Sequence, residues 1–269
     1  MIARKDLISP FLFIIVHRHK LFDAVKLDVR QKYVGSLFGS FWAVIFPLIQ
    51  LSIYAGLYTV IFKVRPSGLT EWGYVLLVFS GLIPLLTFSE ILSTTSNSFS
   101  ANKNILMNTV YPAELIPLRV ALSAQVPGIC GLLITLSLGF FQGRTSYQAL
   151  ILVPVFWLLL LMFSLGIGWL LSLASLVAKD IQHALSLIIM LMIVLSPFAF
   201  TPEMVPTALK PIIYINPLSY FVLTFQQLIC YGVWPNLITS MVAVGLGLSS
   251  FLFGFRTFNK AKAVFFDYA

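Results

Sequence analysis

The stretch Arg30-Gln-Lys-Tyr-Val-Gly-Ser-Leu-Phe-Gly-Ser-Phe-Trp42, which runs on to Pro47, decides the fold. A basic collar is followed by small residues and then by an apolar run, with no charged side chain between Lys32 and Lys63. Lipid tails solvate neither a charge nor an unpaired peptide group, so the collar stays at the head groups and the chain beyond it forms a helix. The stretch therefore predicts a surface helix that turns into a membrane span.

The composition of the whole chain indicates an all-α polytopic membrane protein. Its 269 residues are 59% hydrophobic and 10% charged, with a mean hydropathy of +0.97. A soluble core of this size could not hide so much apolar surface. The net charge of +8 arises from basic residues gathered at predicted membrane edges, without the interleaved aromatics of a nucleic-acid module. We therefore expect membrane lipids as partners and no nucleic acid.

Residues 1–36 are predicted to form an N-terminal cytoplasmic or interface segment. Its apolar stretch 7–16 amounts to roughly 15 Å of helix, too short to cross a membrane. A basic turn at 17–20 is expected to end it. Phe22, Val25 and Val29 then recur at helical spacing, which predicts an amphipathic helix on the membrane surface.

Residues 37–269 are predicted to form a domain of six transmembrane helices. The spans are expected at 37–62, 73–95, 115–141 (or from Pro112), 147–177, 184–200 and 235–255. Residues 201–234 contain four prolines and are too apolar for a solvated loop, so they predict two short re-entrant helices. Thirteen Lys and Arg fall on the side of both termini and four on the other side, which predicts cytoplasmic termini and an outward re-entrant segment.

The sequence lacks the motifs of an enzyme. It has no GxxxxGK[ST] loop and no HExxH motif, and its two cysteines have no metal-ligand spacing. We therefore predict no catalytic residue, no metal and no cofactor bound by this chain, with energy supplied by another chain or by an ion gradient. Glu90 is the one acid within a predicted span; it is either a proton-relay group or a carboxylate paired near the head groups with a base such as Arg119.

Two stretches are candidates for contact with ligands. In the first predicted span, an i+4 stripe suits either stacking on sugar rings along a channel or packing within the bundle; it consists of Trp42, Phe46, Gln50, Tyr54, Tyr58 and Phe62. The second predicted loop carries a short apolar helical piece on the cytoplasmic side. It suits either a groove of a soluble partner or a solvated loop, and its residues are Asn102, Lys103, Asn104, Ile105, Leu106 and Met107.

Three motifs resemble the type-2 ABC exporter permeases that move lipid-linked polysaccharides, the O-antigen permease group with its capsule and teichoic-acid relatives. The first is the opening stretch, with matching positions at Arg30, Tyr33, Gly35, Ser36, Leu37, Gly39, Trp42 and Pro47. The second runs from Asn102 to Leu106 and on through Tyr111-Pro-Ala-Glu-Leu-Ile-Pro117. The third is Asn216-Pro217-Leu218, and together the motifs follow the family's order over nearly the whole chain.

The resemblance implies a homodimer in the bacterial inner membrane that encloses a channel. Two copies of an ATP-binding cassette subunit, which carry ATP and Mg, would dock on the loop at 102–107 and on the N-terminal helix. The implied substrate is a polysaccharide on undecaprenyl diphosphate, with its pyrophosphate near Arg30, Lys32 and Tyr33. The outward helices would gate the exit through Tyr214, Asn216, Pro217, Tyr220 and Phe225.

Other classes of protein remain open on the sequence alone. The nearest are ABC permeases for capsule or teichoic-acid polymers, or for drugs and other lipids. A gradient-driven carrier would need charges at mid-membrane, of which Glu90 is the single candidate. A membrane enzyme acting on lipid-linked sugars would need paired acids or histidines near one interface.

Overall fold

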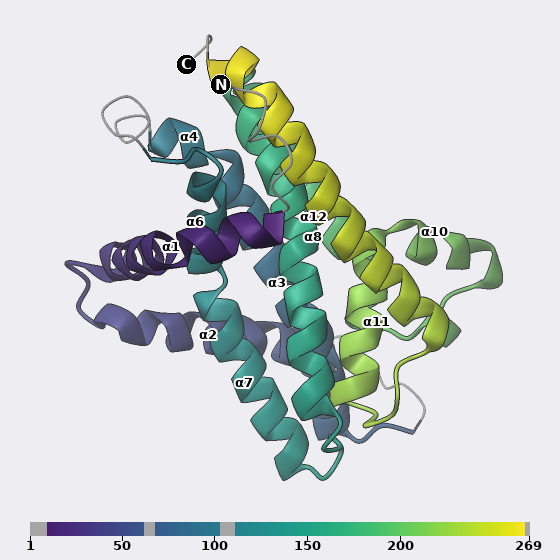
Figure 1. Ribbon diagram of the computed structural model, residues 1–269. Coiled ribbons are helices and arrows are strands. Elements are labelled where there is room, and N and C mark those ends of the chain that lie inside the picture. Colours follow the sequence, from purple (N-terminus) through teal and green to yellow (C-terminus); the bar gives the residue numbers. More distant parts are fainter. Residues whose placement is uncertain (1–9, 62–67, 103–110, 267–269) are drawn as a thin grey trace.

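The computed structural model describes residues 10–61, 68–102 and 111–266, and within these ranges the chain is a bundle of helices with no strand (Figure 1). The helices are α1 (Pro10–Tyr33), α2 (Trp42–Gly56), α3 (Glu71–Ser96), α4 (Ser98–Ala101), α6 (Leu115–Ala124), α7 (Val126–Phe141), α8 (Ala149–Val177), α9 (Asp180–Val194), α10 (Lys210–Ile215), α11 (Pro217–Ile229) and α12 (Leu237–Phe266). Short 3-10 turns occur at Gly39–Phe41, Pro202–Met204 and Thr207–Leu209, and a π-helical turn occupies Leu57–Ile61. The all-α class is therefore confirmed.

Helices α3 and α8 form the centre of the bundle. Within their most apolar windows, 78% of the residues of α3 and 61% of those of α8 are buried, against 11% for the first candidate span, which contains α2. Both central helices are apolar around their whole circumference, as expected of helices covered on every side. Phe163 of α8 stacks on Phe88 of α3 and on Phe221 of α11, with 5.6 Å between ring centroids in each pair, and so joins three helices.

Helices α8 and α12 lie against each other at glycine contacts. A Cβ atom at Gly166 would lie 2.2 Å from the carbonyl oxygen of Ser250, and one at Gly254 would lie 2.2 Å from the carbonyl oxygen of Gly166. Only residues without a side chain allow two backbones to approach this closely. Buried Trp169 packs on the rings of Phe251 and Phe255 farther along the same contact.

Within the described ranges, five helical stretches are long and apolar enough to cross a membrane: Gly39–Ile61, Glu71–Ser96, Leu115–Phe141, Ala149–Val177 and Leu237–Lys262. The fifth span predicted at 184–200 differs in the structure, because α9 has 15 residues and ends at Val194, giving a length of about 22 Å. A sixth span is present only if the pair Thr207–Ile215 and Pro217–Ile229, bent by 99°, is counted as one. That bend is the geometry of a broken span or of a re-entrant segment.

Helix α1 is continuous where the sequence predicted a break at residues 17–20. The imidazole of His17 lies 3.0 Å from the carbonyl oxygen of Phe13, one turn earlier, so the polar residues here belong to a helical face. Phe13 also contacts Phe255 of α12, with 5.6 Å between ring centroids. Figure 1 shows α1 lying across the bundle, with its first turns near α12. The basic residues did not interrupt the helix because their long side chains reach solvent.

Candidate functional site

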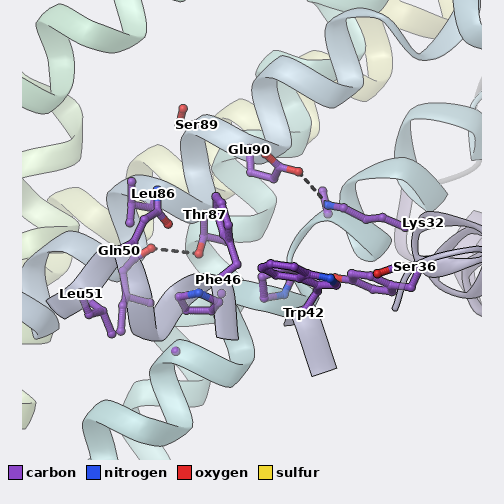
Figure 2. Close-up of a pocket in the computed structure, with 17 residues that line it drawn as sticks. Lys32, Ser36, Trp42, Phe46, Gln50, Leu51, Leu86, Thr87, Ser89 and Glu90 are labelled. Atoms are coloured by element: carbon purple, nitrogen blue, oxygen red, sulfur yellow. Dashed lines mark hydrogen bonds and ion pairs between the residues drawn. The ribbon is translucent and has the colours of Figure 1, made fainter. Parts of the chain in front are cut away.

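A pocket of about 460 Å³ lies between the end of α1 and helices α2, α3 and α7. Its inner wall is apolar, formed by Pro47, Leu51, Ile83, Leu86, Ala124 and Pro127. Its rim carries charged and hydroxyl side chains from α1, the following turn and α3, namely Lys32, Tyr33, Ser36, Ser89 and Glu90 (Figure 2). Trp42 and Phe46 form an aromatic wall beside Gln50 and Thr87. The pocket is thus apolar inside and polar at its mouth.

Two glycines of α7 lie in the pocket wall. A Cβ atom at Gly128 would lie 2.1 Å from the hydroxyl oxygen of Thr87 on α3, and one at Gly131 would lie 3.3 Å from Cβ of Pro47 on α2. The Thr87 hydroxyl itself donates to the carbonyl oxygen of Ile83 at 2.9 Å. Small residues at these positions let α7 approach α2 and α3 closely. Small residues within an apolar run are a sequence signal for such contacts, and Gly128 and Gly131 were not among the predicted site residues.

An ion pair closes one side of the pocket's mouth. The Lys32 ammonium lies 2.9 Å from the Glu90 carboxylate, and the two side chains are 40% and 45% exposed. Figure 2 shows Lys32 reaching from the α1 side toward Glu90 on α3. Glu90 is therefore paired, as one of the two alternatives held, but with Lys32 rather than with the suggested Arg119. At this exposure the pair contributes about 0–1 kcal/mol to stability.

The predicted head-group residues separate on α1. Lys32 and Tyr33 line the pocket, whereas Arg30 is exposed and lies outside its wall. Residues two apart on an α-helix point to different faces, so Arg30 and Lys32 cannot both face the same pocket. Burial raises the pKa of Tyr33, which keeps its phenol protonated and able to donate a hydrogen bond.

The predicted aromatic stripe divides into two parts. Trp42, Phe46 and Gln50 line the pocket, whereas the rings of Tyr54 and Tyr58 meet Phe198 edge to face at 6.0 and 5.8 Å between centroids. The π-helical turn at Leu57–Ile61 also ends the regular i+4 register. Phe62 lies outside the described residues. Of the five stripe residues that the structure describes, three therefore line the pocket and two pack on Phe198.

A second polar cluster lies where the predicted docking loop leaves α4. Arg119 of α6 is 6% exposed, and its Nε lies 3.5 Å from the Asp28 carboxylate of α1. Arg119 also donates to the side-chain oxygen of Asn102, and its guanidinium lies 5.9 Å from the centroid of the Tyr111 ring. The Asn102 amide in turn donates to the carbonyl oxygen of Ser98 at 2.8 Å. One buried cation thus joins α1, α6 and both described flanks of the loop.

The chain after the loop is held by α12 and α8. Lys262 of α12 donates to the Glu114 carboxylate, and the indole of Trp169 on α8 donates to the Glu114 carbonyl oxygen at 3.1 Å. Of the predicted docking residues, Asn102 belongs to the cluster around Arg119. The other five, Lys103, Asn104, Ile105, Leu106 and Met107, lie outside the described residues.

The predicted gate residues surround the bend between α10 and α11. The Asn216 side chain accepts a hydrogen bond from the Leu218 amide at 3.0 Å and donates to the Met192 carbonyl oxygen at 2.7 Å and the Ser196 hydroxyl at 2.8 Å. Pro217 is the first residue of α11. The side chain of Asn216 therefore fixes the bend onto α9 and the chain just after it.

The aromatic members of the predicted gate differ in position. Tyr214 is 43% exposed, and its carbonyl oxygen accepts a hydrogen bond from the Tyr220 hydroxyl at 2.9 Å. Phe225 is fully buried and meets Trp157 edge to face, so it belongs to the packing of α11 on α8. Buried Gln226, one residue further along α11, donates from its amide to the carbonyl oxygens of Pro197 and Phe198.

Among the described residues, no cluster of three or more His, Cys, Asp and Glu side chains could hold a metal ion. The fold and the pocket define a helical membrane protein with several candidate spans. The family model described as ABC-2 type transporter matches residues 24–230, and the chain belongs to this family.

Similar proteins include O-antigen export permeases and a polysialic acid transport protein. An O-antigen export system permease protein RfbA of Klebsiella pneumoniae is 28% identical over 236 residues, which cover 87% of this chain and 89% of that protein. RfbA of Myxococcus xanthus is 22% identical and covers 79% of this chain and 80% of its own length. The polysialic acid transport protein KpsM of Escherichia coli is also 22% identical, with 76% and 79% covered. Each alignment spans most of both proteins.

Proposed function

We propose that this chain is the membrane subunit of an ATP-driven exporter that carries a polysaccharide on undecaprenyl diphosphate, of the O-antigen type, out of the cytoplasm across the bacterial inner membrane. The observation that carries the proposal is the pocket with an apolar inner wall, an aromatic side and Lys32 at its mouth. These are the surfaces that a lipid tail, a sugar ring and a phosphate need. The family and the names of the similar proteins support it.

The pocket residues differ in the part of the substrate that each would bind. Lys32 offers a cation to a phosphate, and the Tyr33 and Ser36 hydroxyls offer hydrogen bonds beside it. Trp42 and Phe46 present flat apolar faces on which a sugar ring can stack without being held by directional bonds. The apolar wall beneath takes the first isoprene units. A surface of this kind binds an amphiphile yet lets the glycan slide onward.

Other chains would supply the energy from ATP and complete the assembly of the exporter. Two copies of an ATP-binding subunit with bound Mg would dock on the loop around 102–107 and on α1, since Arg119 ties α1 to the two described flanks of that loop. Both termini would lie in the cytoplasm. A second copy of this chain would cover α2, whose apolar side chains are mostly uncovered, and would complete the channel. A capsule polymer is the second candidate substrate, on the likeness to KpsM.

The test is translocation by the complex reconstituted in proteoliposomes with whatever ATP-binding subunit copurifies from the native host. We expect glycan to reach the opposite face only with ATP, and Trp42→Ala to lower the rate by about 3- to 10-fold, the loss of one aromatic contact. Trp72→Ala is the matched control, because Trp72 is 69% exposed and lies outside the pocket wall. Transport that follows an ion gradient and ignores ATP overturns the proposal.

A further inference from the structure

The pocket already contains an anion of its own. Among the described residues that line it, Lys32 is the one cation and Glu90 the one acid, and the two are joined at 2.9 Å. The cation that would receive a phosphate is therefore occupied by a carboxylate. Both side chains are nearly half exposed, so the pair can open without uncovering buried charge.

The shape and lining of the pocket favour an amphiphile with an anionic head group. About 460 Å³ is enough for a head group and the start of a tail, and the inner wall offers no charge to hold a purely polar ligand. A bacterial membrane presents such amphiphiles in large excess, among them phosphatidylglycerol, which carries a single phosphate. A lone lysine at the mouth would pair with any of them.

We propose that Glu90 is a built-in competitor for Lys32 and that it sets the charge a head group needs to enter the pocket. A singly charged head group exchanges one ion pair for another and leaves the displaced Glu90 beside the new anion, so it gains nothing. A diphosphate places a second charged group at the rim, where Tyr33 and Ser36 supply donors. The inference rests on the proposed function for the diphosphate lipid, but the competition itself holds for any anionic amphiphile.

The experiment measures lipid binding to the purified protein, with its copurifying subunits, by native mass spectrometry. The probes are phosphatidylglycerol, undecaprenyl diphosphate and inorganic pyrophosphate. We expect Glu90→Gln to bind phosphatidylglycerol up to about fivefold more tightly than the wild type, the size of one half-exposed ion pair released at Lys32. Adding Lys32→Gln to this variant should abolish the gain. Glu203→Gln, in an exposed turn away from the pocket, is the matched control and should change nothing.

Each outcome decides the proposal. An unchanged affinity of Glu90→Gln for phosphatidylglycerol overturns it, as does a loss of affinity for all probes together with a lower melting temperature, which would make Glu90 a structural brace. Equal affinity for inorganic pyrophosphate and for the lipid diphosphate overturns the claim that the apolar wall contributes to binding. If Glu90→Gln binds phosphatidylglycerol more tightly while the wild type does not bind undecaprenyl diphosphate, the proposed competition by Glu90 is supported and the proposed substrate is not.

Discussion

Helix α1 makes two ion pairs one turn apart on the same face, Asp28 with Arg119 and Lys32 with Glu90, and their surroundings differ. Arg119 is nearly buried and also holds Asn102, whereas Lys32 and Glu90 are nearly half exposed at the mouth of a pocket. A buried charge that loses its partner lowers the stability of the fold strongly, whereas an exposed charge that loses its partner is hydrated by water. One helix face therefore carries a fixed anchor and an exchangeable contact.

Removing the anchor should have the largest effect. Arg119→Met leaves Asp28 and Asn102 without their buried partner, and we expect it to lower the free energy of unfolding by about 3–5 kcal/mol. The measurement is thermal unfolding in detergent. The double variant Asp28→Leu with Arg119→Met should recover part of the loss, because no buried charge then lacks a partner. A single variant as stable as the wild type would contradict the assignment of this cation as an anchor.

Filling the pocket from α7 should have an intermediate effect. Gly128→Ala places a methyl group against Thr87, and overpacking of this kind costs about 1–3 kcal/mol. Adding Thr87→Ala should restore most of the stability. The comparison is sharpened by measuring export as well, since the double variant keeps the anchor around Arg119 intact. Gly245→Ala, where nothing lies within 4 Å of the added methyl, is the control in α12.

The anchor should also show a pH dependence. Burial raises the pKa of the Asp28 carboxyl above its usual 3.8, and Arg119 offsets part of the rise. The folded protein then holds this proton more tightly than the unfolded chain. The stability that the protonated Asp28 carboxyl contributes is therefore fully present below the unfolded pKa and is lost as pH rises through the folded pKa. The melting temperature of the wild type should therefore fall as pH rises above about 4, and we expect a smaller fall for Asp28→Asn. Asp23→Asn, at an exposed position of the same helix, is the control and should leave the fall unchanged.

Breaking the exchangeable pair should change stability least. Lys32→Gln is expected to shift the free energy of unfolding by no more than about 1 kcal/mol, because both partners are reached by water. Its effect should appear instead as weaker binding of undecaprenyl diphosphate. Lys26→Gln, an exposed residue of the same helix, controls for the loss of one positive charge. A drop in stability as large as that of Arg119→Met would erase the distinction between the two pairs.

The central helices were predictable because their signal is local. The spans expected at 73–95 and 147–177 match α3 (Glu71–Ser96) and α8 (Ala149–Val177) within two residues at each end, since a long apolar run has one stable form in lipid. The end of α9 was missed because the apolar run continues past Val194 to Phe200, although Pro197 is a sequence signal that a helix ends before it. Hydropathy does not record where a helix ends.

The site was predictable in its parts but not in its assembly. Lys32, Tyr33 and Trp42 follow from the opening stretch, yet the partner of Lys32 is 58 residues away and that of Arg119 lies on another helix. Such pairings depend on how helices pack, which one sequence does not encode by spacing. The stripe divides between Gln50 and Tyr54, because Tyr54 packs on Phe198, a contact between distant parts of the chain that spacing does not reveal.

The glycine contact between α8 and α12 has a consequence for synthesis. The ribosome completes α8 well before α12, so the groove at Gly166 stays open to lipid or to a chaperone until α12 has been synthesised. Lys262, which pairs with the Glu114 carboxylate, lies in the same helix α12. The Glu114 carboxylate beside the predicted docking loop is therefore paired only after α12 has been made, and a subunit that recognises this pair would bind chains that contain α12 and not shorter nascent ones.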